Sequence, residues 1–128
     1  MESGNCPCEG MEKWDLALCL APPRGEYELE YSVGPGTRLV VNRDGVFLRQ
    51  TRPPEALPFM ETIERRVGWD ALEAKGIDAA RVVCDSIRAL ERAAASGSRY
   101  ARSLLEACSS IISLLSRECL GGEDGGEG

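Results

Sequence analysis

Alternation of apolar and polar residues in the first half of the chain constrains the fold more than any other feature. Four segments show it, with apolar positions at Trp14, Leu16, Leu18 and Leu20; Tyr27, Leu29, Tyr31 and Val33; Leu39 and Val41; and Val46 and Leu48. A period of two places each set on one face of a β-strand. Turn-forming residues separate the segments, at 22–25, 34–36 and 44–45. The sequence therefore predicts an antiparallel four-stranded meander over residues 13–50, with one apolar face.

Turn lengths predict which residues lie opposite one another. The predicted neighbours are Leu20 and Tyr27, Tyr31 and Leu39, Leu29 and Val41, and Val41 and Leu48. On the other, polar face, Glu30 is expected near Arg38, an opposite-charge pair across two strands. A slip of one residue in any turn would move every apolar side chain to the wrong face.

The second half of the chain predicts helices. One begins near Pro54 or Pro58 and ends at Gly68, because Ala56, Met60, Ile63 and Val67 have helical spacing. A short helix is expected from Trp69 to Lys75. Asp78 caps a long helix through about Ser96, and Ser98 caps a last helix to about Leu120.

The predicted fold class is therefore α+β, a four-stranded antiparallel β-meander packed against three to four C-terminal helices. Residues 13–120 form a single domain, with the sheet in 13–50 and the helices in 54–120. Residues 1–12 are expected to be disordered, and 121–128 to form a flexible acidic tail rich in glycine.

Composition excludes several classes of function. The chain has 128 residues, a net charge of -6 and no histidine, so the commonest general base and metal ligand are missing. Neither a phosphate-binding loop nor an acid–base pair is evident, so we expect no enzyme activity and no cofactor. No membrane span or signal peptide is evident, and a cytoplasmic location is expected. Few amides and many arginines favour a thermophilic source.

The six cysteines leave two alternatives open, small core residues or a redox or metal site. Cys6, Cys8 and Cys19 offer three sulfurs, one fewer than a closed zinc site needs, so no metal site is predicted. A possible disulfide joins Cys84 to Cys108, if their two helices form a hairpin centred on Gly97.

Arginines and aromatic residues gather around the last predicted hairpin and the end of the first helix. The set comprises Arg38, Phe47, Arg49, Arg52, Arg65, Arg66 and Trp69. Guanidinium groups bind phosphates and aromatic rings stack on bases, so the set is a candidate nucleic-acid-binding site. Ordinary surface arginines and core aromatics are the alternative interpretation.

The last predicted helix has an unusually wide apolar face. Its candidate interface residues are Leu104, Leu105, Ile111, Ile112 and Leu115. A face this wide is either deeply buried in the domain or contacts a second subunit, and a dimer or tetramer is expected.

In element order, in its Arg-rich hairpin with Phe47, and in its Leu- and Ile-rich helix over 104–119, the chain resembles the ThermoDBP family of hyperthermophilic archaea. That resemblance implies a single-stranded nucleic-acid-binding protein, with a cleft between sheet and helices and with C-terminal helices that join subunits. It implies DNA or RNA as the partner without separating the two.

Three functions follow as hypotheses. The first is non-catalytic binding of single-stranded DNA or RNA through arginine–phosphate contacts and aromatic stacking. The second is a protein–protein assembly subunit or adaptor that docks through its apolar C-terminal helix. The third is a redox- or metal-responsive regulator that uses Cys6, Cys8 and Cys19.

Overall fold

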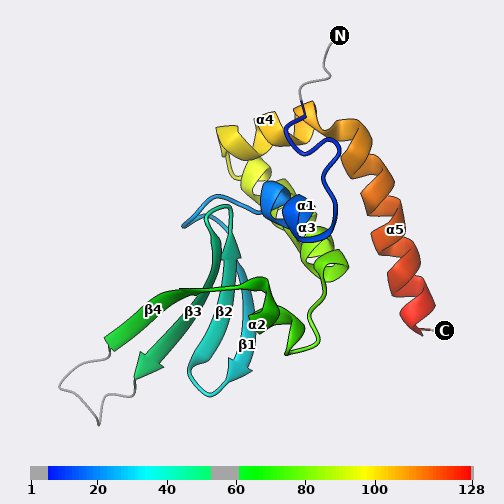
Figure 1. The fold of residues 1–128 in the computed structure, drawn as a ribbon. Coiled ribbons are helices and arrows are strands. Elements are labelled where there is room, and N and C mark those ends of the chain that lie inside the picture. The colour runs from blue at the N-terminus through cyan, green and yellow to red at the C-terminus, as the bar shows by residue number, and fades with distance from the viewer. Residues whose placement is uncertain (1–5, 53–60, 128) are drawn as a thin grey trace.

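The structure is a computed structural model that describes the backbone of residues 6–52 and 61–127. Side chains are described for 6–51 and 62–119. The elements in chain order are α1 (Lys13–Leu20), β1 (Leu29–Gly34), β2 (Thr37–Asn42), β3 (Gly45–Arg52), β4 (Glu61–Val67), α2 (Trp69–Glu73), α3 (Ala79–Ala95), α4 (Arg99–Ala107) and α5 (Ser109–Glu127). The α+β class is confirmed. Figure 1 shows the sheet on one side, with α1 and α3 against one end of it.

The sheet is an antiparallel meander with strand order β1-β2-β3-β4. Leu29 pairs with Val41 and Tyr31 with Leu39, so the register predicted for this hairpin is confirmed. The next hairpin differs, because Val46 lies opposite Val41, and Leu48 opposite Leu39. The prediction of Val41 beside Leu48 was wrong because Asn42 and Gly45 form the last pair, which leaves a tight two-residue turn.

Residues 13–20, predicted as the first strand, instead form helix α1. The segment is built from Leu, Ala, Lys and other residues that tolerate a helix, and it has no β-branched residue. Ala17 and Leu20, one helical turn apart, are fully buried. Pro22 and Pro23 follow directly and bring the chain out in an extended conformation. The predicted pairing of Leu20 with Tyr27 was therefore wrong.

The fourth strand of the sheet comes from residues predicted as helix. β4 pairs along β3 from Val46 opposite Val67 to Arg52 opposite Glu61. Ile63 and Val67 share the face of the apolar residues on β3, while Glu64 lies on the opposite face beside Arg49. The helical spacing misled because Ile63 and Val67 are also an even number of residues apart, which suits one face of a strand. Pro54, Ala56, Pro58 and Met60 lie outside the described residues.

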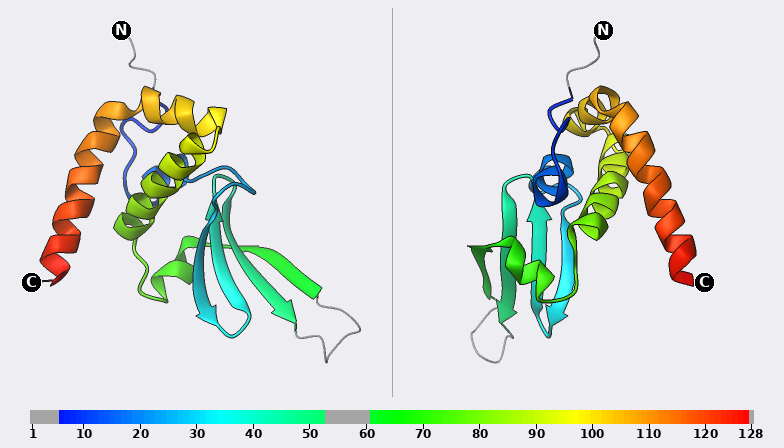
Figure 2. Two further views of the ribbon diagram at one scale, coloured as in Figure 1. Left: turned by 180° about the vertical axis from the view of Figure 1, so that it is seen from behind. Right: turned by 45° about the vertical axis from the view of Figure 1, so that its right-hand side comes forward.

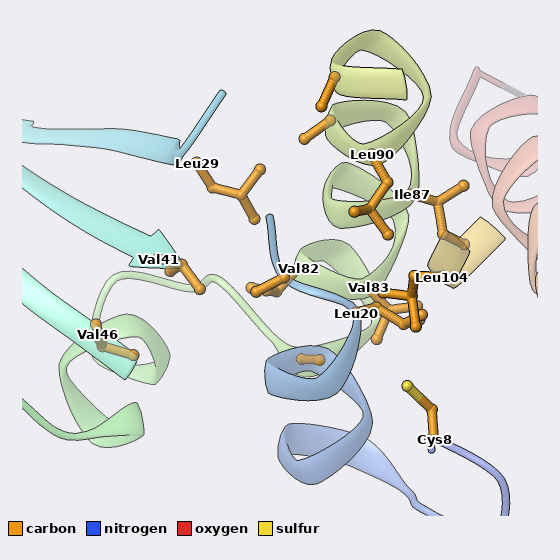
Figure 3. Close-up of a cluster of buried hydrophobic side chains, with 14 of the residues drawn as sticks. Cys8, Leu20, Leu29, Val41, Val46, Val82, Val83, Ile87, Leu90 and Leu104 are labelled. Atoms are coloured by element: carbon orange, nitrogen blue, oxygen red, sulfur yellow. The ribbon is translucent and has the colours of Figure 1, made fainter. Parts of the chain in front are cut away.

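The core lies between the inner face of the sheet and the helices. Figure 3 shows Leu29, Val41 and Val46 on the sheet side of this core. On the helix side they face Val82 and Leu90 of α3 and Leu20 of α1. Helix α3 begins as predicted, because the Asp78 side chain accepts a hydrogen bond from the Arg81 backbone N–H. The short helix α2 is also confirmed.

The last predicted helix is two helices. Ser98 caps α4 as expected, by accepting from the Ala101 backbone N–H. Cys108 then leaves helical geometry, with φ -109° and ψ 23°, and the chain turns into α5. Figure 2 shows α5 running back past α3 but apart from it in both views. Its backbone is helical to Glu127, so 121–127, predicted as a flexible tail, continue the helix.

Candidate functional site

The outer face of the sheet, which faces away from the helices, carries a network of ion pairs. We call it the outer-face network, and its members are Arg24, Glu28, Glu30, Arg38, Arg49 and Glu64. Arg49 lies at its centre, with nitrogen–oxygen distances of 2.9 Å to Glu64, 3.6 Å to Glu28 and 3.8 Å to Glu30. Arg38 donates to Glu30 at 2.7 Å, which confirms the predicted cross-strand pair.

These contacts change the proton affinity of two members of the network. The hydrogen bond that Arg49 donates holds the pKa of Glu64 below its ordinary value. The same bond raises the pKa of Arg49, and burial opposes that shift in part. Each arginine of the outer-face network already lies beside a carboxylate.

Phe47, predicted as a stacking platform for bases, is covered by two arginines. The guanidinium of Arg24 lies 4.8 Å from the ring centroid and that of Arg66 lies 5.0 Å from it. Only 7% of Phe47 is exposed. Arg66 also donates to the backbone carbonyl of Asp44 at 2.6 Å. Cation–π contacts of this kind stabilise the face of the sheet and leave little of the ring open to a base.

Of the other predicted nucleic-acid residues, Arg65 and Trp69 do not join this face. Arg65 lies opposite Leu48, so it occupies an inner-face position, and it is exposed. Trp69 stacks on Trp14 with ring centroids 4.8 Å apart, and thereby fastens α2 to α1. The Arg52 side chain lies outside the described residues. The structure thus brings together Arg38, Phe47, Arg49 and Arg66 of the predicted set, and adds Arg24 and Glu64 to them.

All six cysteines form disulfides, and the predicted bridge from Cys84 to Cys108 was wrong. The pairs are Cys6–Cys108, Cys8–Cys19 and Cys84–Cys119. The prediction assumed one straight helix after Gly97. Because the chain turns at Cys108, α5 brings Cys119 to Cys84, and Cys108 meets the N-terminal segment. Residues 6–12, predicted as disordered, are held by two of these bridges, and Cys8 is 1% exposed.

Helix α5 meets α3 at a disulfide that is flanked by two grooves. The Cys84–Cys119 disulfide bridges it to α3. On one side of that bridge is a mostly apolar groove of about 260 Å³, lined by residues that include Leu16, Val83 and Leu115. On the other side a groove of about 210 Å³ lies beside Ile87 and Ser116. Two grooves therefore flank the bridge, while Ile112 of the same helix is buried in the core.

The predicted interface residues divide between the core and the surface. Leu104 and Ile112 are 5% and 7% exposed, so they belong to the core of the single chain. Leu105, Ile111 and Leu115 are partly exposed. Leu114, which the sequence did not single out for the interface, is 60% exposed. Leu114 lies three residues after Ile111, so the two side chains are neighbours on the surface of the helix. This spacing could have identified Leu114 as an interface candidate.

No family model, curated protein or solved structure matches this chain. The resemblance to ThermoDBP proteins and the thermophilic source therefore stay predictions. No helix in the described part of the chain is long and apolar enough to cross a membrane.

Proposed function

We propose that this chain is a protein-assembly subunit that docks through α5, and that the partner is a second copy of the chain. One observation carries the proposal: Leu114 is 60% exposed on α5, the helix whose disulfide to α3 is flanked by two grooves. Ile111 and Leu115 are partly exposed on the same helix. Apolar side chains so arranged are typical of helix–helix interfaces.

Charge and side-chain size favour a second copy as the partner. Between Ser109 and Cys119, α5 carries one positive and one negative side chain, Arg117 and Glu118. Two copies of this segment therefore do not repel each other, although the whole chain has a net charge of -6. Serines at 109, 110, 113 and 116 are small enough for a second helix to approach. Two-fold symmetry is the commonest symmetry of homodimers, and a two-fold axis would place each α5 against the other.

The test is the mass of the particle in solution as a function of concentration. We expect wild-type chain to dimerise, and Leu114→Glu to weaken the dimer by about 3 kcal/mol, roughly a hundredfold, because two leucines leave the interface. Ser103→Glu adds the same charge at an exposed position of α4, outside the proposed interface, and is the matched control, which we expect to dimerise. A wild-type monomer at every concentration, or equal dimerisation of both variants, contradicts the proposal.

Single-stranded nucleic-acid binding on the outer face is a second candidate. The observation in its favour is that four arginines, Arg24, Arg38, Arg49 and Arg66, share one face of the sheet. A phosphate there must compete with Glu28, Glu30 and Glu64. This competition is why we rank it below assembly.

A titration of labelled single-stranded DNA and RNA at two salt concentrations tests this second candidate. Binding on this face should weaken steeply with salt and with Arg38→Ala, because the Arg38 side chain is 41% exposed and pairs with Glu30. Arg65→Ala, at an inner-face position, should bind as wild type. No binding at low salt removes the second candidate.

The three disulfides bear on where the protein works. Disulfides persist in oxidising compartments and in the cytosol of hyperthermophiles. We therefore infer that the protein works either in an oxidising compartment or in the cytosol of a hyperthermophile. The predicted cytoplasmic location requires a hyperthermophile.

A further inference from the structure

Two of the disulfides lie side by side and form one cluster of four sulfurs. The Sγ atoms of Cys6, Cys8 and Cys108 all lie within 4.8 Å of one another. Cys19 is bonded to Cys8, so its sulfur belongs to the same cluster. The four residues come from the N-terminal turn, from α1 and from the junction of α4 with α5. Cys108 is the fourth sulfur, which the sequence alone did not place beside the other three.

We propose that the reduced chain binds one Zn²⁺ through Cys6, Cys8, Cys19 and Cys108. Four thiolates in a tetrahedron, each about 2.3 Å from the metal, are a common structural zinc site. That geometry separates the sulfurs by about 3.8 Å, which is within the present spread of the Cys6, Cys8 and Cys108 Sγ atoms. We expect rotation of the four side chains, once the two disulfides are reduced, to bring the sulfurs to these positions.

The surroundings suit a closed metal site with a path for entry. Cys8 and Cys108 are each 1% exposed, whereas Cys6 and Cys19 are partly exposed. Cys19 lines a pocket of about 400 Å³ that also contains Arg43 and is open to solvent. Four thiolates and one Zn²⁺ have a net charge of -2, and the pocket beside Cys19 is lined by one positive residue, Arg43, and one negative residue, Asp15.

The contact between the N-terminal segment, α1 and the α4–α5 junction can therefore be held in two ways, by disulfides or by a metal ion. In the oxidised state it is held by the Cys6–Cys108 and Cys8–Cys19 disulfides. A dithiol reductant gives two electrons and two protons to each disulfide and is itself oxidised to a disulfide. Zn²⁺ then displaces the four protons of the resulting thiols and binds the four sulfurs as thiolates. Either state fastens residues 6–12 and α1 to the start of α5.

Thiol alkylation of the reduced chain is the first test. The chain is reduced, loaded with Zn²⁺ or left without metal, and treated with iodoacetamide before mass spectrometry. We expect Zn²⁺ to protect Cys6, Cys8, Cys19 and Cys108 and to leave Cys84 and Cys119 reactive. Cys84 and Cys119 are a built-in control, because within the described residues no third cysteine or acidic side chain is grouped with them. Protection of fewer than four sulfurs, or no change with Zn²⁺, overturns the proposal.

Cobalt substitution is the second test, because Co²⁺ reports tetrahedral thiolate ligands by its visible spectrum. We expect one Co²⁺ per reduced wild-type chain, with strong thiolate charge-transfer bands that Zn²⁺ abolishes. Cys108→Ser should lose these bands, and the double variant Cys84→Ser with Cys119→Ser should keep them. A wild-type spectrum from Cys108→Ser overturns the site, and the alkylation result decides the case if that variant does not fold.

Discussion

The sheet and the helical half of this molecule are stabilised by different interactions. Every cysteine lies outside β1 to β4, and the disulfides join only the N-terminal segment, α1, α3, the α4–α5 junction and α5. The sheet instead relies on hydrogen-bonded hairpins and on the outer-face network. The helical half should therefore respond to reductant, and the sheet to salt and pH.

The difference follows from the length of chain between partners. Neighbouring strands are joined by short turns in two hairpins, so little entropy is lost when they pair. Cys6 and Cys108 are 102 residues apart, and their contact would be costly to form without a covalent bond. We therefore expect the loss of a long disulfide to cost more stability than the loss of an ion pair in the sheet.

Removal of the longest bridge should have the largest effect. We expect Cys6→Ser with Cys108→Ser to lower the free energy of unfolding of the oxidised chain by about 4 to 5 kcal/mol. Cys8→Ser with Cys19→Ser, which opens a loop of sequence separation 11, should cost about 3 kcal/mol. Urea unfolding without reductant measures both. Equal losses would break the link between loop length and stability.

Removal of the central arginine should have the largest effect within the sheet. Arg49→Met leaves Glu28, Glu30 and Glu64 without their shared partner, and we expect a loss of about 1 to 2 kcal/mol in urea unfolding. Arg65→Met, at an exposed inner-face position, should change stability by less than about 0.5 kcal/mol. Similar losses in both variants would show that the outer-face network does not stabilise the sheet.

Tyr31 links the two halves, and its loss should have an intermediate effect. Its hydroxyl donates to Asp85 of α3 at 2.7 Å, and Tyr31→Phe should cost about 1 kcal/mol. Burial, and then this hydrogen bond, raise the pKa of Tyr31 well above its ordinary value of 10.0. The unfolded chain therefore ionises first, and wild-type stability should fall as the pH rises above 10.0.

We expect Tyr31→Phe not to show this loss of stability at alkaline pH. Thermal unfolding across that pH range measures the difference between the variant and the wild type. Tyr27→Phe, at a residue that is 47% exposed, is the control and should keep the wild-type profile. A Tyr31→Phe profile as steep as wild type would remove Tyr31 from the alkaline response.

Glu64 should give the smallest effect, visible in acid. Because the folded pKa of Glu64 lies below its ordinary value of 4.5, its stabilisation is present above pH 4.5 and is lost as the pH falls through the folded pKa. Glu64→Gln should cost about 0.5 kcal/mol at neutral pH and should flatten the acid decline. Glu106→Gln, on the exposed face of α4, should keep the wild-type decline. Acid unfolding followed by circular dichroism measures it, and high salt should reduce the effect in the wild type.

Local signals were sufficient for the parts of the fold whose partners are close in sequence. The β1–β2 pairing, the Glu30–Arg38 contact and the Asp78 cap of α3 were all predicted correctly. Each depends on a turn or a cap that a few neighbouring residues determine. Of the candidate nucleic-acid set, the sequence placed Arg38 and Arg49 on the polar face, but it did not show that Glu64 would come to that face on a fourth strand.

The sequence by itself determined an apolar-faced β-meander, the long capped helix α3 and an apolar C-terminal helix, because these depend on periodicity and caps. Only the tertiary structure decided that residues 13–20 are helix, that residues 61–67 are strand, and which cysteines are paired. The alternating leucines before Leu20 suit a strand or a helix equally well, and burial against α3 selects the helix. A sulfur likewise has no local preference among partners, so the turn of the chain at Cys108 decided which cysteines meet.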